Sequence, residues 1–183
     1  MPVIVDSYSE SNCGGYYQMS SNADDSMGCG QSFTGDGGVL NSVKFYLKKI
    51  TSITGTAYVK IYAHTGTFGT SSLPTGSALA ISDVFDVSTL TTSFQLITFT
   101  FTGAEKITLT NETKYIATFE YQDDGTNVMA FGVDYTGNHN GNFCRSIEDL
   151  VSWEVNNPAH DACFYVYGES YASPLPAFRR PTS

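Results

Sequence analysis

The side chains best suited to chemistry in this sequence gather in one Asn- and Gly-rich stretch and at the single tryptophan. Tyr135 offers an aromatic ring, Asn138 and Asn140 offer amides, and His139 offers an imidazole, with Trp153 close behind. A pocket for a small ligand combines apolar or aromatic surface with a few polar groups that fix orientation, which is what a sugar requires. These five residues are therefore the predicted carbohydrate-binding site. The alternative is ordinary loop chemistry for the asparagines and a core position for the tryptophan.

Enzyme motifs are missing from the chain. The sequence has no GxSxG elbow, no P-loop and no HExxH. Asp123 and Asp124 are adjacent carboxylates, but a glycine follows them, which is typical of a tight turn, whereas glycosidase carboxylates face each other across a cleft. We expect a protein that is not an enzyme, with a glycan-active enzyme as the third alternative.

The cysteines and histidines do not form a metal-binding pattern. Cys13, Cys29, Cys144 and Cys163 include no Cys-x-x-Cys pair, and the three histidines are scattered, so a zinc site is not expected. We expect buried free thiols at these positions. A disulfide such as Cys13–Cys29 is the alternative.

The elements that would position these groups are β-strands. Apolar residues alternate with Lys, Tyr and Thr at 43–48 and again at 56–63. Because strand side chains point to opposite faces with period two, each run has one buried and one solvated face, as in an antiparallel sheet. Tyr46, Tyr58 and Tyr62 fall on the solvated faces of this central pair. They form a second candidate platform, for a sugar or for a neighbouring subunit.

Short alternating runs recur along the rest of the chain and predict eight to ten strands with very little helix. Two packed antiparallel sheets bury the apolar faces of so many one-sided strands. The predicted fold class is therefore all-β, an antiparallel two-sheet β-sandwich of jelly-roll type. The further runs that we interpret as strands are 3–5, 29–34, 94–101, 114–121, 128–133 and 162–167. Between them we expect a long loop at 6–30 with room for one short strand, a loop at 64–76 and one helical turn at 146–151.

The chain divides into a single predicted domain and a tail. The domain covers 1–172, and its first part, 1–28, is one strand followed by a long loop region. The tail, 173–183, holds three prolines in eleven residues and cannot join a sheet interior. The tail also carries two apolar side chains and an arginine pair, so it is a candidate partner-binding segment, with plain disorder as the alternative. The partner-binding residues are Leu175, Phe178, Arg179 and Arg180.

Composition and charge narrow the function classes. The net charge is −9, and residues 115–169 carry nine acids and one base, so nucleic acid is not an expected partner. The one basic cluster is the four lysines within 44–60. No stretch approaches the roughly 20 apolar residues that cross a bilayer, so membrane insertion is not expected. The first twelve residues, MPVIVDSYSESN, lack the basic and apolar regions of an export signal, and we expect none.

A series of phrases between residues 29 and 168 resembles a known module. The chain is similar to the β-sandwich modules of the choice-of-anchor kind, which recur in bacterial surface proteins and phage virion proteins and resemble jelly-roll carbohydrate-binding domains. The phrases that carry this resemblance are GQSF (30–33), LNSVKFYLKK (40–49), GTAYVKIYA (55–63), LPTGSALA (73–80), FQLITFTF (94–101), the run 109–115 and DACFYVYG (161–168).

The resemblance implies display or adhesion rather than catalysis. It also implies a candidate calcium ion where the first and last strands meet, at Asp6, Glu10 and Asp161, with solvated carboxylates as the alternative. No other cofactor is expected. Because the chain lacks the export signal and anchor of the bacterial surface proteins, the leading expectation is a structural protein of a phage-like virion. It would decorate a capsid or a tail fibre and bind glycans weakly.

The expected partners of this virion protein are other copies of the chain, a capsid or tail protein, and cell-surface glycans. The alternative is a carbohydrate-binding or adhesion module of a bacterial cell surface, located outside the cell.

Overall fold

The computed structural model describes residues 1–20, 26–122, 127–147 and 150–169. This part of the chain forms fourteen strands and three short 3-10 helices, and it holds no helix long and apolar enough to cross a membrane. In chain order the elements are β1 (Pro2–Tyr8), η1 (Glu10–Asn12), β2 (Gly15–Met19), β3 (Ser26–Thr34), β4 (Val39–Lys49), β5 (Thr56–Thr65), β6 (Leu73–Ile81), β7 (Phe85–Asp86), η2 (Val87–Thr89), β8 (Gln95–Thr100), η3 (Gly103–Glu105), β9 (Lys114–Gln122), β10 (Met129–Asp134), β11 (Phe143–Ile147), β12 (Trp153–Glu154), β13 (Asp161–Ala162) and β14 (Phe164–Glu169).

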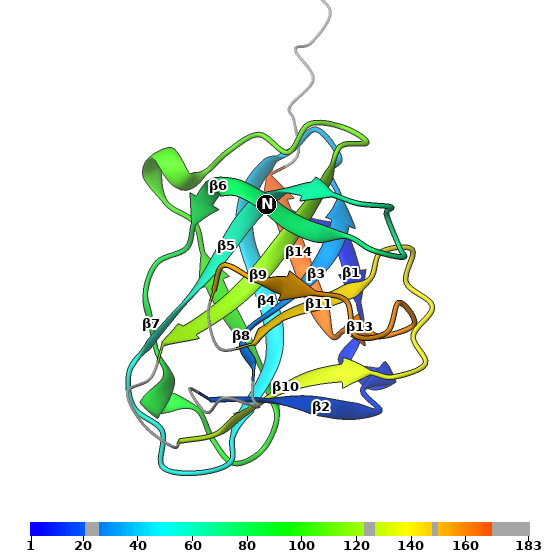
Figure 1. Ribbon diagram of the computed structural model, residues 1–183. Coiled ribbons are helices and arrows are strands. Elements are labelled where there is room, and N and C mark those ends of the chain that lie inside the picture. Colours follow the sequence, from blue (N-terminus) through cyan, green and yellow to red (C-terminus); the bar gives the residue numbers. More distant parts are fainter. Residues whose placement is uncertain (21–25, 123–126, 148–149, 170–183) are drawn as a thin grey trace, which may run out of the picture.

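The strands form two sheets of seven, which confirms the predicted all-β, two-sheet antiparallel sandwich (Figure 1). Sheet I contains β1, β14, β4, β8, β10, β13 and β2. Sheet II contains β12, β11, β3, β9, β5, β6 and β7. Within each sheet every pairing is antiparallel, and the sheets are joined at one point, where Met19 of β2 pairs with Ser26 of β3 in parallel.

The core between the sheets is largely aromatic. Phe131 of β10 packs 4.9 Å from Phe45 of β4 in the same sheet, and it reaches across to Phe119 of β9 and Phe143 of β11 at 6.2 and 6.0 Å between ring centroids. All four rings are fully buried. Their tilted contacts add attraction to the burial of their apolar area. The inner face of each sheet is therefore occupied by the core, and the side chains on the two outer faces lie outside it.

The count of fourteen strands exceeds the eight to ten expected from sequence. The additional strands are short: β7, β12 and β13 have two residues each, too few to show any alternation. In the predicted loop at 6–30, β2 is the one short strand that was allowed for, but the loop is wrong at its ends, because β1 continues to Tyr8 and β3 already begins at Ser26. Cross-strand pairing to neighbours, which the local sequence does not encode, makes these segments strands.

The two strongest sequence strands are not a pair. Strand β4 pairs with β14, β8 and β10 in sheet I, whereas β5 pairs with β9, β6 and β7 in sheet II. Tyr46 therefore lies on the opposite side of the molecule from Tyr58 and Tyr62, and the predicted shared platform is wrong. The alternation of apolar and polar residues predicts which side chains of a strand face the core. It does not predict which strand lies beside it in the sheet.

Three smaller expectations also have an outcome. The helical turn at 146–151 is wrong at its start, because Ser146 belongs to β11, and the loop at 64–76 ends earlier than expected, because β6 begins at Leu73. All four cysteines are free, so no disulfide joins Cys13 to Cys29. The carboxylate pair at 123–124 and the tail at 173–183, with its four candidate partner-binding residues, lie outside the described residues.

Candidate functional site

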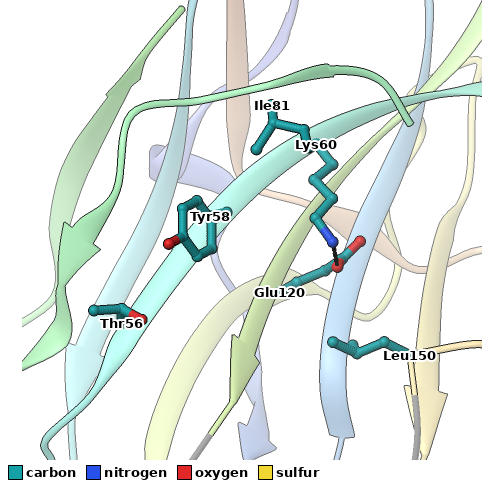
Figure 2. Close-up of a pocket in the computed structure, with 6 residues that line it drawn as sticks. All are labelled: Thr56, Tyr58, Lys60, Ile81, Glu120 and Leu150. Atoms are coloured by element: carbon teal, nitrogen blue, oxygen red, sulfur yellow. Dashed lines mark hydrogen bonds and ion pairs between the residues drawn. The ribbon is translucent and has the colours of Figure 1, made fainter. Parts of the chain in front are cut away.

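The face of sheet II turned away from the core is hollowed by two adjoining pockets. We call them together the sheet II groove; Leu150 lines both. The first pocket has a volume of about 240 Å³ and is lined by Thr56, Tyr58, Lys60, Ile81, Glu120 and Leu150 (Figure 2). The second has a volume of about 410 Å³ and is lined by Tyr62, Pro74, Thr75, Gly76, Leu150, Val151 and Trp153.

Curvature of sheet II shapes this groove. The strands run in the order β12, β11, β3, β9, β5, β6, so β12 and β6 stand at opposite edges. These two edge strands nevertheless contact each other, so the sheet curls around its outer face. The side chains on the outer face of β9 are consequently covered, with Thr118 fully buried and Glu120 only 3% exposed.

Trp153 forms one wall of the groove because Gly28 has no side chain. Ser146 of β11 lies between them, paired with Trp153 on one side and with Gly28 on the other. A Cβ atom at Gly28 would lie 2.6 Å from ring atom Cη2 of Trp153 and 3.0 Å from a methyl carbon of Leu150. The indole N–H donates to the carbonyl oxygen of Leu150 at 3.3 Å. The ring therefore rests against the backbone of β3.

The floor of the groove holds a hydrogen-bonded cluster centred on Glu120. Its carboxylate accepts from Lys60 Nζ at 2.5 Å, from the Tyr62 hydroxyl at 2.9 Å and from Thr118 Oγ1 at 2.9 Å. Lys60 and Tyr62 come from β5, and Glu120 sits across from Tyr58 in the paired strand β9. Figure 2 shows the ammonium of Lys60 directed at the carboxylate, with Tyr58 beside it on the same strand.

The charges in this cluster balance each other. The Lys60 side chain is 25% exposed and the Glu120 side chain 3%, so the ion pair is largely shielded from water. Burial, followed by the nearby charge of Glu120 and the hydrogen bond to it, raises the pKa of Tyr62 well above its ordinary value. Tyr62 therefore stays protonated at neutral pH and remains a hydrogen-bond donor to Glu120.

The groove combines the two features that sugar recognition requires. Tyr58, Tyr62 and Trp153 supply aromatic surface, and Tyr58 is 37% exposed. Lys60 and Glu120 supply fixed polar groups beside those rings. Among the described lining residues Glu120 is the only carboxylate, whereas glycoside hydrolysis commonly employs two that flank the scissile bond. Chemically, the groove can pack a sugar ring on aromatic surface beside fixed polar groups.

The predicted loop site is a separate structure. His139 is mainly a structural link: its Nδ1 accepts from the Gly141 N–H at 2.9 Å, so its Nε2–H donates to Asp6 Oδ1 at 2.9 Å. Its side chain is only 9% exposed. The Tyr135 hydroxyl donates to the carbonyl oxygen of Tyr16 at 2.7 Å. These bonds hold the loop 135–142 against β1 and β2.

Of the five predicted sugar-binding residues, Trp153 alone lines the sheet II groove. Tyr135, Asn138 and Asn140 are exposed on the loop, but none of the three lines the groove. Sequence proximity suggested that the loop and the tryptophan act together, and the fold places them apart.

The three predicted calcium ligands are already engaged by the protein. Asp6 accepts from the Thr34 and Ser7 backbone N–H groups as well as from His139. Asp161 accepts from the Gln31 side chain and from the His139 N–H, and Glu10 accepts from the Tyr165 hydroxyl. Within the described ranges no group of three or more His, Cys, Asp or Glu residues could hold a metal ion.

Sequence reasoning missed Lys60 and Glu120. Lys60 was interpreted as part of a solvated strand face, and Glu120 is the one acid in the mainly apolar and aromatic run 115–121. An acid inside such a strand signals a buried polar partner, because an unpaired carboxylate is costly to bury. The sequence therefore indicates that Glu120 has a buried polar partner. It does not indicate which residue that partner is, because Lys60 lies sixty residues away.

Comparisons with known proteins do not add to this picture. No protein-family model, no curated protein and no solved structure matches the chain. The site must therefore be interpreted from its own chemistry.

Proposed function

We propose that this protein is a non-enzymatic display module that binds a glycan in the sheet II groove. The observation that supports this proposal most strongly is a groove lined by three aromatic residues, Tyr58, Tyr62 and Trp153. The floor of this groove is the Lys60–Glu120 pair. Sugar rings stack on aromatic faces, and fixed polar groups accept and donate bonds to their hydroxyls. Because the two charges cancel, the groove suits a neutral sugar. Two adjoining pockets suit a chain of sugars rather than one residue.

A glycan array with matched variants tests this proposal. We expect Trp153→Ala and Tyr58→Ala each to reduce binding at least tenfold, while Tyr135→Ala leaves it within twofold. Tyr135 is a fair control because it is 41% exposed, close to the 37% of Tyr58, but lies outside the groove. Thermal unfolding of each variant separates lost binding from lost folding. Binding that depends on Tyr135 and not on Trp153 would move the site to the loop.

The enzyme alternative has its own test. Incubation with the polysaccharides that bind should release no reducing ends. Steady hydrolysis that disappears in Glu120→Gln, with folding retained, would contradict the non-enzymatic part of the proposal.

The setting that we propose for the module is the surface of a phage-like virion, where copies contact one another and a capsid or tail protein. The jelly-roll strand order and kinship with choice-of-anchor-type modules are part of this proposal and rest on the sequence phrases at 29–168. A structural feature favours assembly: β1 pairs only with β14 among the described strands, and its Val3 and Ile4 are 40% and 54% exposed. A free strand edge with apolar side chains can pair with another chain.

Sedimentation equilibrium tests the assembly. We expect a concentration-dependent oligomer that Ile4→Lys converts to monomer, because a charged side chain at the edge opposes pairing. A monomer at every concentration would contradict contact between copies and would favour the alternative, an adhesion module of a bacterial surface.

A further inference from the structure

The outer face of sheet I carries a second group of rings, here with unpaired positive charge. On β4, Lys44, Tyr46 and Lys48 point away from the core, between the buried Val43, Phe45 and Leu47. Neighbouring strands and the loop before β8 extend this surface with further aromatic rings. We call it the sheet I platform; its members are Tyr16, Lys44, Tyr46, Lys48, Phe94 and Tyr167.

The rings of the platform hold the two ammonium groups. Lys48 Nζ lies 4.6 Å from the ring centroid of Phe94 and 5.1 Å from that of Tyr16. Lys44 Nζ lies 5.1 Å from the ring centroid of Tyr167. An ammonium over a ring face is attracted by the ring, yet its N–H groups find no acceptor there and remain available.

These two lysines differ from the other four. Lys60 and Lys106 are paired with carboxylates, Lys49 donates to the Ser88 carbonyl oxygen, and Lys114 donates to the Thr34 hydroxyl. Within the described residues, Lys44 and Lys48 have neither a hydrogen-bond acceptor nor an ion-pair partner. In a chain with a net charge of −9, two such cations on one face are a notable concentration of positive charge.

The platform has the dimensions of a site for more than one sugar residue. Lys44 and Lys48 are four residues apart on one strand, so their Cα atoms are separated by about 13 Å. Beside Lys48 is a shallow hollow of about 370 Å³, which Tyr16, Tyr46 and Phe94 also line. Within it Phe94 and Tyr46 are stacked with ring centroids 4.9 Å apart.

One acid opposes an anion in this hollow. Glu10 also lines it, and its carboxylate accepts from the Tyr165 hydroxyl at 2.6 Å. That hydrogen bond lowers the pKa of Glu10, with a smaller contribution from the charge of Lys44, so Glu10 is negative at neutral pH. One negative charge therefore faces the two cations of the platform, so it weakens their attraction for an anion without cancelling it.

We propose that the sheet I platform is a second binding site, which takes the carboxylate groups of an acidic polysaccharide. Each carboxylate would accept hydrogen bonds from the free donors of Lys44 or Lys48, and the sugar rings would pack on the adjoining aromatic edges. The partner class follows from the chemistry of the platform itself: the two cations match carboxylates, and the rings beside them offer an apolar surface on which sugar rings can pack. This site is independent of the sheet II groove.

A pair of matched polymers and a pair of matched variants test the proposal. The polymers are polygalacturonate and its fully methyl-esterified form, which differ in the charge of the carboxyl groups. The test variant is Lys44→Met/Lys48→Met, and the control is Lys49→Met/Lys106→Met, which changes the net charge equally elsewhere. By titration calorimetry at low salt we expect polygalacturonate to bind wild type and control within threefold of each other, and the test variant at least tenfold more weakly.

Two more results are expected of the same site. The esterified polymer should bind at least tenfold more weakly than polygalacturonate, and added salt should weaken binding of the acid form because exposed charges are screened. Glu10→Gln should strengthen binding of the acid form, since it removes the opposing charge and keeps an acceptor for Tyr165.

Three outcomes would overturn the inference. The first is equal binding of both polymers, and the second is an equal loss of binding in the test and control variants. The third is that sedimentation shows a dimer for wild type and a monomer for the test variant, while neither polymer binds. The platform would then be a contact between two copies of the chain. Trp153→Ala should lose binding in the sheet II groove and still bind polygalacturonate as wild type does, so failure of one site is distinguishable from failure of the other.

Discussion

Breaking the Lys60–Glu120 pair is a direct test of how the sheet II groove is held together. Glu120 is 3% exposed and accepts hydrogen bonds from Lys60, Tyr62 and Thr118 at 2.5, 2.9 and 2.9 Å. Lys60→Met keeps most of the apolar stem and removes the ammonium, which leaves the carboxylate buried with two neutral donors. Removing one partner of a buried ion pair costs about 3–5 kcal/mol. Because the Lys60 side chain is 25% exposed, solvent screening reduces our expectation to about 2–3 kcal/mol.

The second half of the test is a double-mutant cycle. Glu120→Gln keeps the shape and one acceptor, and we expect it to cost about 1–2 kcal/mol, since the Lys60 side chain, 25% exposed, can turn its ammonium to water. The double variant should be about 1–2 kcal/mol more stable than the sum of the two single effects, because no unpaired charge remains in it. Urea unfolding at pH 7 measures all three free energies, provided that the slope with urea is unchanged.

An exposed ion pair provides the control for this cycle. Lys106→Met breaks the pair with Glu169, whose side chains are 33% and 47% exposed, and should change the stability by less than about 0.5 kcal/mol. Single effects of Lys60→Met and Glu120→Gln that add within about 0.5 kcal/mol would refute the reasoning, because the two groups would then not be coupled.

Three further predictions concern the rest of the molecule. His139→Ala should destabilise the protein by about 2–4 kcal/mol in urea unfolding, since it removes a largely buried ring, the acceptor of the Gly141 N–H and one donor to Asp6, whereas the exposed neighbour Asn140→Ala should cost less than about 0.5 kcal/mol. Burial and a hydrogen-bonded carboxylate raise the pKa of Tyr8 to about 12. The contribution of Tyr8 to the free energy of unfolding is therefore fully present below pH 10 and is lost as the pH rises towards 12. In Tyr8→Phe the free energy of unfolding should fall less steeply over that pH range. Burial raises the pKa of the Cys144 thiol, so iodoacetamide at pH 8, followed by mass spectrometry, should label the partly exposed Cys13 and leave Cys144 unmodified in folded protein.

The fold class could be predicted from local patterns alone. The alternation of β4 is reproduced in the structure, with Val43, Phe45 and Leu47 fully buried and the intervening side chains outside. The same holds for β5, where Ala57, Val59 and Ile61 are buried. A period-two pattern over eight or more residues is decided by the chain itself, so it survives in any sheet.

The partners of these strands could not be predicted in the same way. Strands β4 and β5 follow each other but lie in different sheets, and β4 pairs with β14 instead, about 120 residues further along the chain. The residues that face the core look alike whichever strand lies beside them. Pairing depends on how both sheets bury their faces together, which is a property of the whole chain.

Amino-acid sequence by itself determined that this protein is an antiparallel β-sandwich, that it is acidic, and that aromatic residues remain outside its core. Only the tertiary structure decided which of those aromatic residues lie together. It placed Trp153 over Gly28 in the sheet II groove, near the Lys60–Glu120 pair, and it placed Tyr46 with Lys48 on the sheet I platform. The reason is that strand alternation is local, whereas a groove is made by side chains from strands that meet only when the sheets curl and pack.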